Sequence, residues 1–281
     1  MPDTFSWAIR WPRFVTALAA GIALASAGTV LQRLVYNPLA SPDILGISAG
    51  ATFALIATSV FLGVNIFASG ALIAFSGSMV VLALLLLLGR KNQFSPASMI
   101  MTGIAISALI ESLVQFSLAK GTQDSYTIIS WLAGSTYRVT ADAALTLAFS
   151  VMLIFSLIVS VSRWLTLLSA GRQFAAARGL NVQRCSIILL CAVALLCALV
   201  TTTMGPVAFI GLLAPHIAVM LGAKQARAQL IVAALCGGLL MLIADWLGQI
   251  LLFPMQIAAG TLVSIIGGGY FLILLIRGQK Y

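Results

Sequence analysis

The sequence GPVAFIGLLAPHIAV, residues 205–219, decides how the rest of the chain is interpreted. In lipid, every backbone N–H and C=O must be satisfied within the protein, so a helix broken by proline is tolerated only where it is buried or faces a water-filled cavity. Transporters place such segments around the moving substrate. A kinked structural helix is the alternative, because glycine and proline are common in membrane helices. The residues that depart from the apolar pattern are Gly205, Pro206, Gly211, Pro215 and His216.

The composition identifies the class of protein. Of 281 residues, 62% are hydrophobic and 7% are charged, and the mean hydropathy is +1.13. These values are far outside the range of soluble globular proteins and predict an all-α, polytopic transmembrane helical bundle that forms one domain over residues 1–281. The net charge of +9 comes from Lys and Arg residues placed singly or in pairs between apolar runs, as in membrane loops. Lipid, and no nucleic acid, is therefore the expected partner.

Apolar runs of about 20 residues mark the expected membrane spans. With the C-terminus in the cytoplasm, eleven of the fifteen Lys and Arg residues lie on that side, and the other side keeps Arg10, Arg13, Lys120 and Arg138. The positive-inside rule therefore predicts a cytoplasmic C-terminus and an outward N-terminus. We expect nine spans, of which the seventh is short: 13–33, 44–63, 68–89, 96–118, 140–162, 185–204, 207–221, 228–249 and 257–276.

Two connections carry patterns that allow two interpretations each. In NPLASPDILGISAG, residues 37–50, the prolines predict an extended turn. Gly46 and Gly50 then form a small-xxx-small pair, which suits helix packing beside a pathway or an ordinary helix contact. In KGTQDSYTIISWLAGSTYR, residues 120–138, the aromatic residues suit anchors at the membrane interface or a re-entrant element at the outer mouth.

Residues 169–184 form the longest expected cytoplasmic loop. Their sequence, SAGRQFAAARGLNVQR, contains strong helix formers at Ala175 to Ala177 and a natural helix stop at Gly179. We expect a short helix there.

Acidic residues inside membrane spans are costly, so each is a hypothesis about function. Glu111 and Asp245 are the two that qualify, and both fall in the outer part of their spans. A group of outer polar residues over an apolar inner half predicts a water-filled outward vestibule, although solvation near the surface or structural pairing would explain it too. The residues assigned to this vestibule are Glu111, Gln115, Asp245, Gln249 and Gln256.

Several chemistries are not expected. His216 has no second histidine and no acid beside it in sequence, so a metal site lacks ligands and a hydrogen-bonded structural role is predicted. The four cysteines lie in apolar segments and are interpreted as small core residues. The dipeptide Gly-Lys never occurs, so a phosphate-binding loop of the G-x-x-x-x-G-K-[ST] type is absent. We expect no catalytic residue and no cofactor bound by this chain.

The motifs together resemble one transporter family. GPVAFIGLLAPHIA resembles the signature of bacterial ABC-importer permeases for iron–siderophore complexes, haem and vitamin B12. The resemblance is greatest to the C-terminal half of the fused hydroxamate-siderophore, ferrichrome-type permease. It extends over RWPR at 10–13, NPLASPDILGISAGA at 37–51, WLAGSTY at 131–137, RWLTLL at 163–168, and FPMQIAAG with GGGYF within 253–271.

This resemblance implies partners and sites. It implies a separate ABC ATPase that uses ATP, a periplasmic substrate-binding protein, and a second permease half in a homodimer or pseudo-dimer. Arg10 and Arg13 match the family's Arg-x-Pro-Arg positions, which implies docking of the binding protein. The expected short helix resembles the family's coupling helix, although Arg172 and Gln173 replace its usual acidic residues. The implied ATPase contacts are Ala175, Ala176, Arg178, Gly179 and Leu180.

Family members resemble a ten-helix unit in which RWPR follows a first helix, and that helix is absent here. A fragment, a shortened gene product and half of a fused permease are all compatible with this.

The expected function is a permease for ferric hydroxamate siderophores in the bacterial inner membrane. Vitamin B12 or haem is the competing cargo within the family. An ion-coupled secondary transporter would need an acid at the membrane midplane, whereas Glu111 and Asp245 lie farther out. A non-transporting scaffold would need neither the broken segment nor the cytoplasmic helix.

Overall fold

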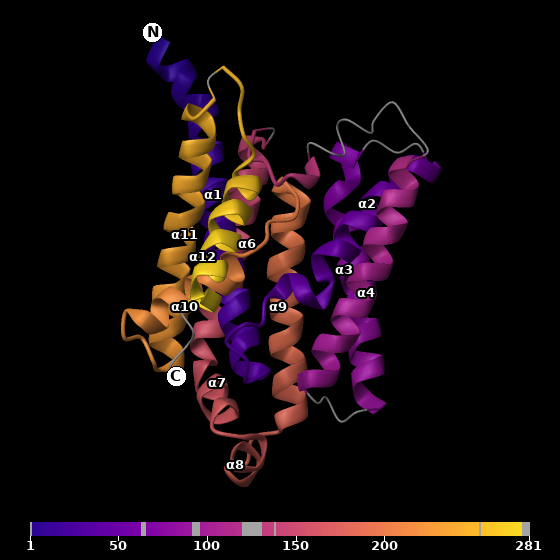
Figure 1. The fold of residues 1–281 in the computed structure, drawn as a ribbon, viewed down its shortest axis with the longest axis vertical. Coiled ribbons are helices and arrows are strands. Elements are labelled where there is room, and N and C mark those ends of the chain that lie inside the picture. The colour runs from indigo at the N-terminus through magenta and orange to yellow at the C-terminus, as the bar shows by residue number, and fades with distance from the viewer. Residues whose placement is uncertain are drawn as a thin grey trace.

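The computed structural model describes residues 2–62, 66–91, 96–119, 131–137, 139–252 and 254–276. Figure 1 shows an elongated bundle of helices. The N-terminus lies at one end, here called the N-terminal end, and helix α8 lies at the other, here called the α8 end. The elements are α1 (Pro2–Leu34), the 3₁₀ helix η1 (Pro42–Leu45), α2 (Ile47–Leu62), α3 (Ile66–Lys91), α4 (Pro96–Ala119), α6 (Ala141–Ser160), α7 (Ser162–Ser169), α8 (Arg172–Ala177), α9 (Val182–Met204), α10 (Ile210–Met220), α11 (Ala226–Ile250) and α12 (Ala259–Ile276).

The described residues confirm the all-helical fold class. Within the described ranges, five helices are long and apolar enough to cross a membrane, and they lie in α1, α3, α6, α9 and α11. Four shorter apolar helices lie in α2, α4, α10 and α12. Each of the nine expected spans therefore coincides with one of these helices, since a run of apolar residues is a local property of the sequence.

Helix α1 forms the centre of the bundle because small residues let its neighbours approach closely. A Cβ atom at Gly21 would lie 2.2 Å from the backbone oxygen of Gly237 in α11. A Cβ atom at Gly28 would lie 1.8 Å from the backbone oxygen of Gly211 in α10. Backbone contacts this close exclude any side chain, so glycine is required at these positions.

Helices α2, α3 and α4 stand together on the other side of α9 (Figure 1). The glycine pair predicted to mediate helix packing, Gly46 and Gly50, contacts α4 and α3. Gly46 ends η1 with a φ of 71° and faces Ser107 of α4, and Gly50 packs against Gly77 of α3. Trp131 is partly buried and packs against a small buried cluster from α2 and α3 that includes Ala51. Tyr126 lies outside the described residues.

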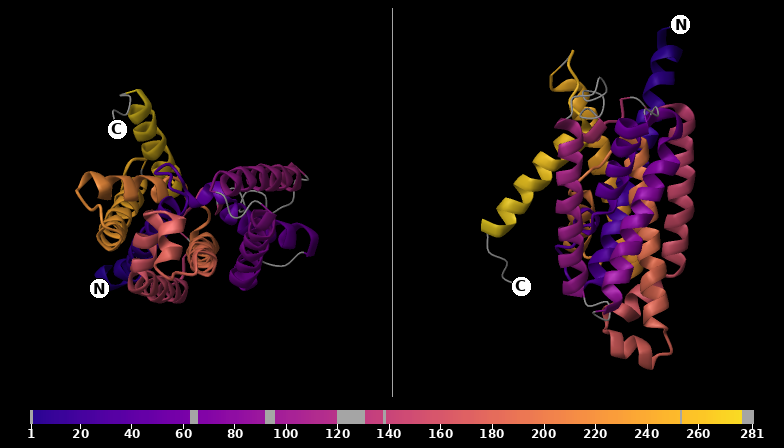
Figure 2. Two further views of the ribbon diagram at one scale, coloured as in Figure 1. Left: turned by 90° about the horizontal axis from the view of Figure 1, so that it is seen from below. Right: turned by 90° about the vertical axis from the view of Figure 1, so that its right-hand side faces the viewer.

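The helix break occurs where the first proline lies. Helix α9 ends at Met204, residues 205–209 are not helical, and α10 starts at Ile210. Pro215 lies inside α10 and does not end it, so only one of the two prolines coincides with the break. Figure 2 shows that α12 leans away from the rest of the bundle.

The predicted short helix in the 169–184 loop is present as α8. Gly179 follows it with a φ of 80°, and its N–H donates to the backbone oxygen of Ala176. The four cysteines are free, and two of them, Cys185 and Cys197, are buried.

Candidate functional site

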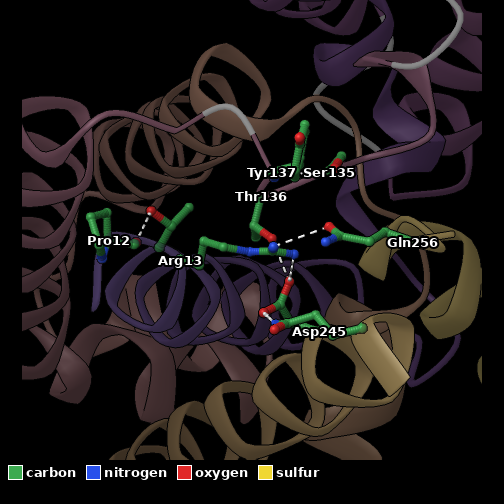
Figure 3. A network of polar contacts seen from close by, with 9 residues as sticks. Pro12, Arg13, Ser135, Thr136, Tyr137, Asp245 and Gln256 are labelled. Atoms are coloured by element: carbon green, nitrogen blue, oxygen red, sulfur yellow. Dashed lines mark hydrogen bonds and ion pairs between the residues drawn. The ribbon is translucent and has the colours of Figure 1, made fainter. Parts of the chain in front are cut away.

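A polar network lies at the N-terminal end of the bundle and centres on Asp245 in α11 (Figure 3). The carboxylate accepts a hydrogen bond from the Thr136 hydroxyl and one from Gln249 Nε2 at 2.8 Å. Arg13 Nη2 of α1 lies 3.5 Å from Asp245 Oδ1, and the two side chains are only 11% and 8% exposed. The charge of Asp245 is therefore compensated inside the protein.

Arg13 also joins two loops to this network. Its Nη1 donates to Gln256 Oε1 at 3.1 Å, and its guanidinium carbon lies 5.8 Å from the centre of the Tyr137 ring. The network thus links helices α1 and α11 to two loops, the one before α6 and the one between α11 and α12. The N-terminal network is defined here as Arg13, Thr136, Tyr137, Asp245, Gln249 and Gln256.

The two arginines of RWPR therefore have different environments. Arg10 is exposed, whereas Arg13 is largely covered and engaged with Asp245 and Gln256. Docking of a binding protein remains a prediction for both, but only Arg10 presents a freely accessible side chain. Lys120 and Arg138, the other cations expected on this side, have side chains outside the described residues.

Glycines hold the loops of the network against the helix break. A Cβ atom at Gly205 would lie 2.1 Å from the backbone oxygen of Trp131, and one at Gly134 would lie 2.7 Å from that of Pro206. The N–H of Gly260 donates to Gly134 O at 2.9 Å. The motifs at 131–137 and 253–260 therefore meet the start of the broken segment, which explains why both contain glycine.

Asp43 is a site residue that the sequence analysis missed. Its carboxylate accepts hydrogen bonds from the Ser41 hydroxyl at 3.1 Å and from the backbone N–H of Phe209. Phe209 has a left-handed φ of 67° and occupies the N-cap position of α10. Its side chain makes no capping hydrogen bond to the first turn of that helix. Asp43 therefore satisfies a backbone donor at the break, as a capping residue does. The signal was an acid next to proline, as the one charged residue of the loop.

The 3₁₀ helix η1 packs directly on α10. A Cβ atom at Gly211 would lie 2.7 Å from Pro42 Cδ. Gln32 Nε2 of α1 donates to the backbone oxygen of Gly211 at 3.4 Å. The connection after the first span and the broken segment thus form one contact region, as Figure 1 also suggests from the position of α10 beside the turn after α1.

His216 differs from its expected hydrogen-bonded role. Its Nε2 is buried and has no hydrogen-bond partner among the described residues. The ring packs edge-on against Tyr270 of α12, with the ring centres 5.9 Å apart. Within the described part of the chain, no group of three His, Cys, Asp or Glu residues is placed to hold a metal ion.

The predicted vestibule residues divide into two groups. Asp245, Gln249 and Gln256 come together in the N-terminal network. Glu111 and Gln115 lie apart on α4, and both side chains are exposed. Structural pairing therefore accounts for the first group, while the second group is open to its surroundings.

The α8 end has its own polar contacts, which connect the end of α7, just before α8, to the centre of the bundle. Arg33 Nε of α1 donates to Gln229 Oε1 at 2.7 Å, and its Nη1 donates to the Ser169 hydroxyl at 3.3 Å. The Tyr36 hydroxyl donates to the backbone oxygen of Leu168 at 2.5 Å. Burial raises the pKa of the Tyr36 phenol, and the charge of Arg172 opposes that rise.

In α8 itself and the turn after it, the residues predicted to contact an ATPase are mostly accessible. Ala175 is fully buried against the bundle and Leu180 is partly buried, whereas Ala176, Arg178 and Gly179 are exposed. The Arg178 guanidinium carbon lies 5.1 Å from the centre of the Phe174 ring. The exposed face of this segment therefore does not pack against the hydrophobic core of the chain.

Known proteins resemble this chain over most of its length. It is 40% identical over 285 residues to the iron(3+)-hydroxamate import system permease FhuB of Escherichia coli, covering all of this chain and 42% of the relative. FhuB of Salmonella typhimurium is 39% identical, with 96% and 40% covered. The chain thus spans about two fifths of the length of these relatives. The permease YfmE of the Fe(3+)-citrate import system of Bacillus subtilis is 36% identical, with 95% and 80% covered.

A solved structure of a metal-chelate type ABC transporter in an inward-facing conformation has the same fold. Its TM-score is 0.88 at 27% sequence identity, and the match covers 97% of this chain and 88% of that chain. The FecCD transport family matches residues 1–277 of this chain. With this match, and with relatives of at least 34% identity aligned along nearly the whole sequence, the chain belongs to the FecCD transport family.

Proposed function

We propose that this chain is a membrane-spanning permease subunit of a bacterial ABC importer that carries ferric hydroxamate siderophores across the inner membrane. The observation that carries the proposal is the 40% identity to FhuB along the whole chain. Relatives for ferric citrate and other siderophores are less similar, at 34 to 36% identity. This difference favours hydroxamates as the cargo within the iron-chelate class.

The proposed assembly contains two permease units, two ATPase subunits and a periplasmic binding protein. In the proposed orientation, the N-terminal end faces the periplasm and the C-terminus lies in the cytoplasm. Arg10 at the N-terminal end would receive the binding protein, and the exposed part of the α8 segment would contact the ATPase. The exposed small residues there suit a helix that is seated in a groove of another protein.

The coupling route in this proposal uses the contacts at the α8 end. Helix α8 follows α7 directly, and the end of α7 is held by Arg33 and Tyr36, at the end of α1. A displacement of α8 would therefore act on α1, which packs on both α10 and α11. This would transmit motion from the ATPase to the broken segment.

The compensated state of Asp245 argues against an ion-coupled transporter. A proton- or sodium-coupled carrier needs an acid that is free to bind the ion near the midplane. Asp245 instead interacts with Arg13, Thr136 and Gln249 at the N-terminal end.

The test is uptake by the complete assembly in proteoliposomes. The permease is reconstituted with its ATPase and binding protein, and uptake of a neutral ferric trihydroxamate is measured with ATP inside or outside the vesicles. We expect uptake that requires ATP and the binding protein. Uptake of vitamin B12 or haem, but of no hydroxamate, would replace the proposed cargo. Uptake driven by an ion gradient without ATP would refute the ABC mechanism.

A further inference from the structure

The outer half of α4 has three distinct faces. At about 100° per residue, Ile110, Val114 and Ser117 share one face, and all three are buried. Leu109, Leu113 and Phe116 share a second face, which is exposed and apolar. The third face carries Ala108, Glu111, Ser112 and Gln115, all of them exposed. This third face is here called the α4 polar face.

The second face has the composition expected for contact with lipid, but the α4 polar face does not. The exposed surface of α6 shows the lipid-facing pattern, with Leu145, Phe149 and Leu153. A carboxylate in lipid is costly, so acids inside a membrane span nearly always face a protein interior or water. Glu111 lies eight residues before the end of α4, or about 12 Å along the helix. The α4 polar face is therefore expected to border a water-filled space.

The position of this face in the fold agrees with a pathway. It borders Ser107, which lies against Gly46 at the end of η1. The 3₁₀ helix η1 in turn packs on the start of α10 through Pro42 and Gly211. The α4 polar face thus lies next to the side of α4 that is joined to the helix break through η1. Ile104, nearer the α8 end, continues this face with an apolar residue, so the polar character is confined to the outer half.

Glu111 differs from Asp245 in its charged neighbours. Among the residues that the structure describes, no cationic side chain pairs with it, whereas Asp245 is paired with Arg13. The side chains beside it, Ser112 and Gln115, are neutral. A carboxylate beside a water-filled space attracts cations that pass it and repels anions.

We propose that Glu111 sets the charge selectivity of the transport pathway, so that cationic ferric chelates pass more readily than anionic ones of the same size and shape. This inference rests on the proposed function, because it assumes that the chain carries an iron chelate. The uptake of neutral chelates is little affected, since a single charged side chain acts mainly on the net charge of the chelate. Glu111 is thus a specificity-determining residue, not a ligand of the iron.

The test compares three forms of one ferric trihydroxamate scaffold. One form carries a pendant ammonium, one is neutral, and one carries a pendant carboxylate. Uptake of each is measured with the complete assembly in proteoliposomes, for wild type, Glu111→Gln, Glu111→Lys and Glu111→Asp. The same binding protein is used throughout, so that its own preference cancels when a variant is compared with wild type.

We expect Glu111→Gln to lower the cation-to-anion uptake ratio about three- to tenfold, which is the effect of one unit charge acting across several ångströms of partly screened space. Glu111→Lys should lower the ratio further, and Glu111→Asp should keep it. Asp142→Asn, which removes an exposed acid in the first turn of α6 at the same end of the bundle, is the matched control and should leave the ratio within about twofold.

The outcomes separate this inference from the proposed function. Wild-type uptake of the neutral chelate with an unchanged ratio in both Glu111→Gln and Glu111→Lys would overturn the inference alone. Equal loss of all three chelates together with dissociation of the paired permease would place Glu111 in a subunit interface and also overturn it. Absence of uptake of every trihydroxamate by wild type would reject the proposed function, and this inference with it.

Discussion

Arg13 and Asp245 are separated by more than 230 residues in sequence, yet their charged groups lie 3.5 Å apart near the N-terminal end of the bundle. Both side chains are largely covered by protein, and each makes a further contact with a loop residue. The pair therefore joins the two helices that contain it to the loops on either side.

Removing one member of this pair is expected to destabilise the protein. Asp245→Ala leaves a covered guanidinium without its counter-charge, which typically costs about 3–5 kcal/mol for a buried pair. Thermal unfolding of the purified protein in detergent measures the effect. The double variant Arg13→Met with Asp245→Leu should recover most of the loss, since it removes both charges. Equal unfolding temperatures for wild type and Asp245→Ala would show that the pair contributes nothing.

Arg10 and Arg13 are expected to differ in a docking assay. The family resemblance implies acidic partners for Arg10 on the binding protein. Arg10→Glu should therefore weaken capture of the loaded binding protein by at least about tenfold, because a favourable contact becomes a like-charge contact. Its unfolding temperature should stay that of wild type, since the side chain is exposed. Arg13→Glu should lower the unfolding temperature as well, because it places two carboxylates side by side. Surface plasmon resonance at low and high salt checks the first effect, and unchanged binding by Arg10→Glu would remove Arg10 from the docking site.

Asp43 is expected to stabilise the helix break. Asp43→Ala removes the acceptor for the Phe209 N–H and should cost about 1 kcal/mol, as loss of a helix cap does. Asp43→Asn keeps an acceptor oxygen in the same place and should retain most of that stability. The two variants are compared by thermal unfolding and by ATP-dependent uptake. If alanine and asparagine behave alike, the hydrogen bond to Phe209 has no energetic role.

The exposed face of α8 is expected to couple ATP hydrolysis to transport. Ala176→Trp adds a bulky group on that face, and overpacking of an interface typically costs about 1–3 kcal/mol. Substrate-stimulated ATPase activity and uptake should both fall sharply, while binding-protein capture at the opposite end should persist. Gly179→Trp combines bulk with a backbone φ of 80° that tryptophan disfavours. Normal stimulation in both variants would make this loop a simple connector.

The membrane spans were predictable because each span is a continuous run of apolar residues in the sequence. The helix break at Pro206 and the end of α8 just before Gly179 were predictable for the same reason, since proline and glycine act on the backbone locally. The partner of Arg13 could not be predicted, because several acidic and amide side chains could have formed a contact with it. Asp43 was overlooked since the sequence predicted only an extended turn there, whereas the chain folds this turn against Gly211 in the bundle.

The glycine contacts of α1 also determine which parts of the molecule can slide. The backbone of α1 touches that of α10 at Gly28 and that of α11 at Gly21, with no side chain between them to rearrange. Side chains can change rotamer and absorb a displacement, but two backbones in contact cannot. We therefore expect these three helices to move as one block, so that opening of a passage is accommodated at the contacts between this block and the helices around it.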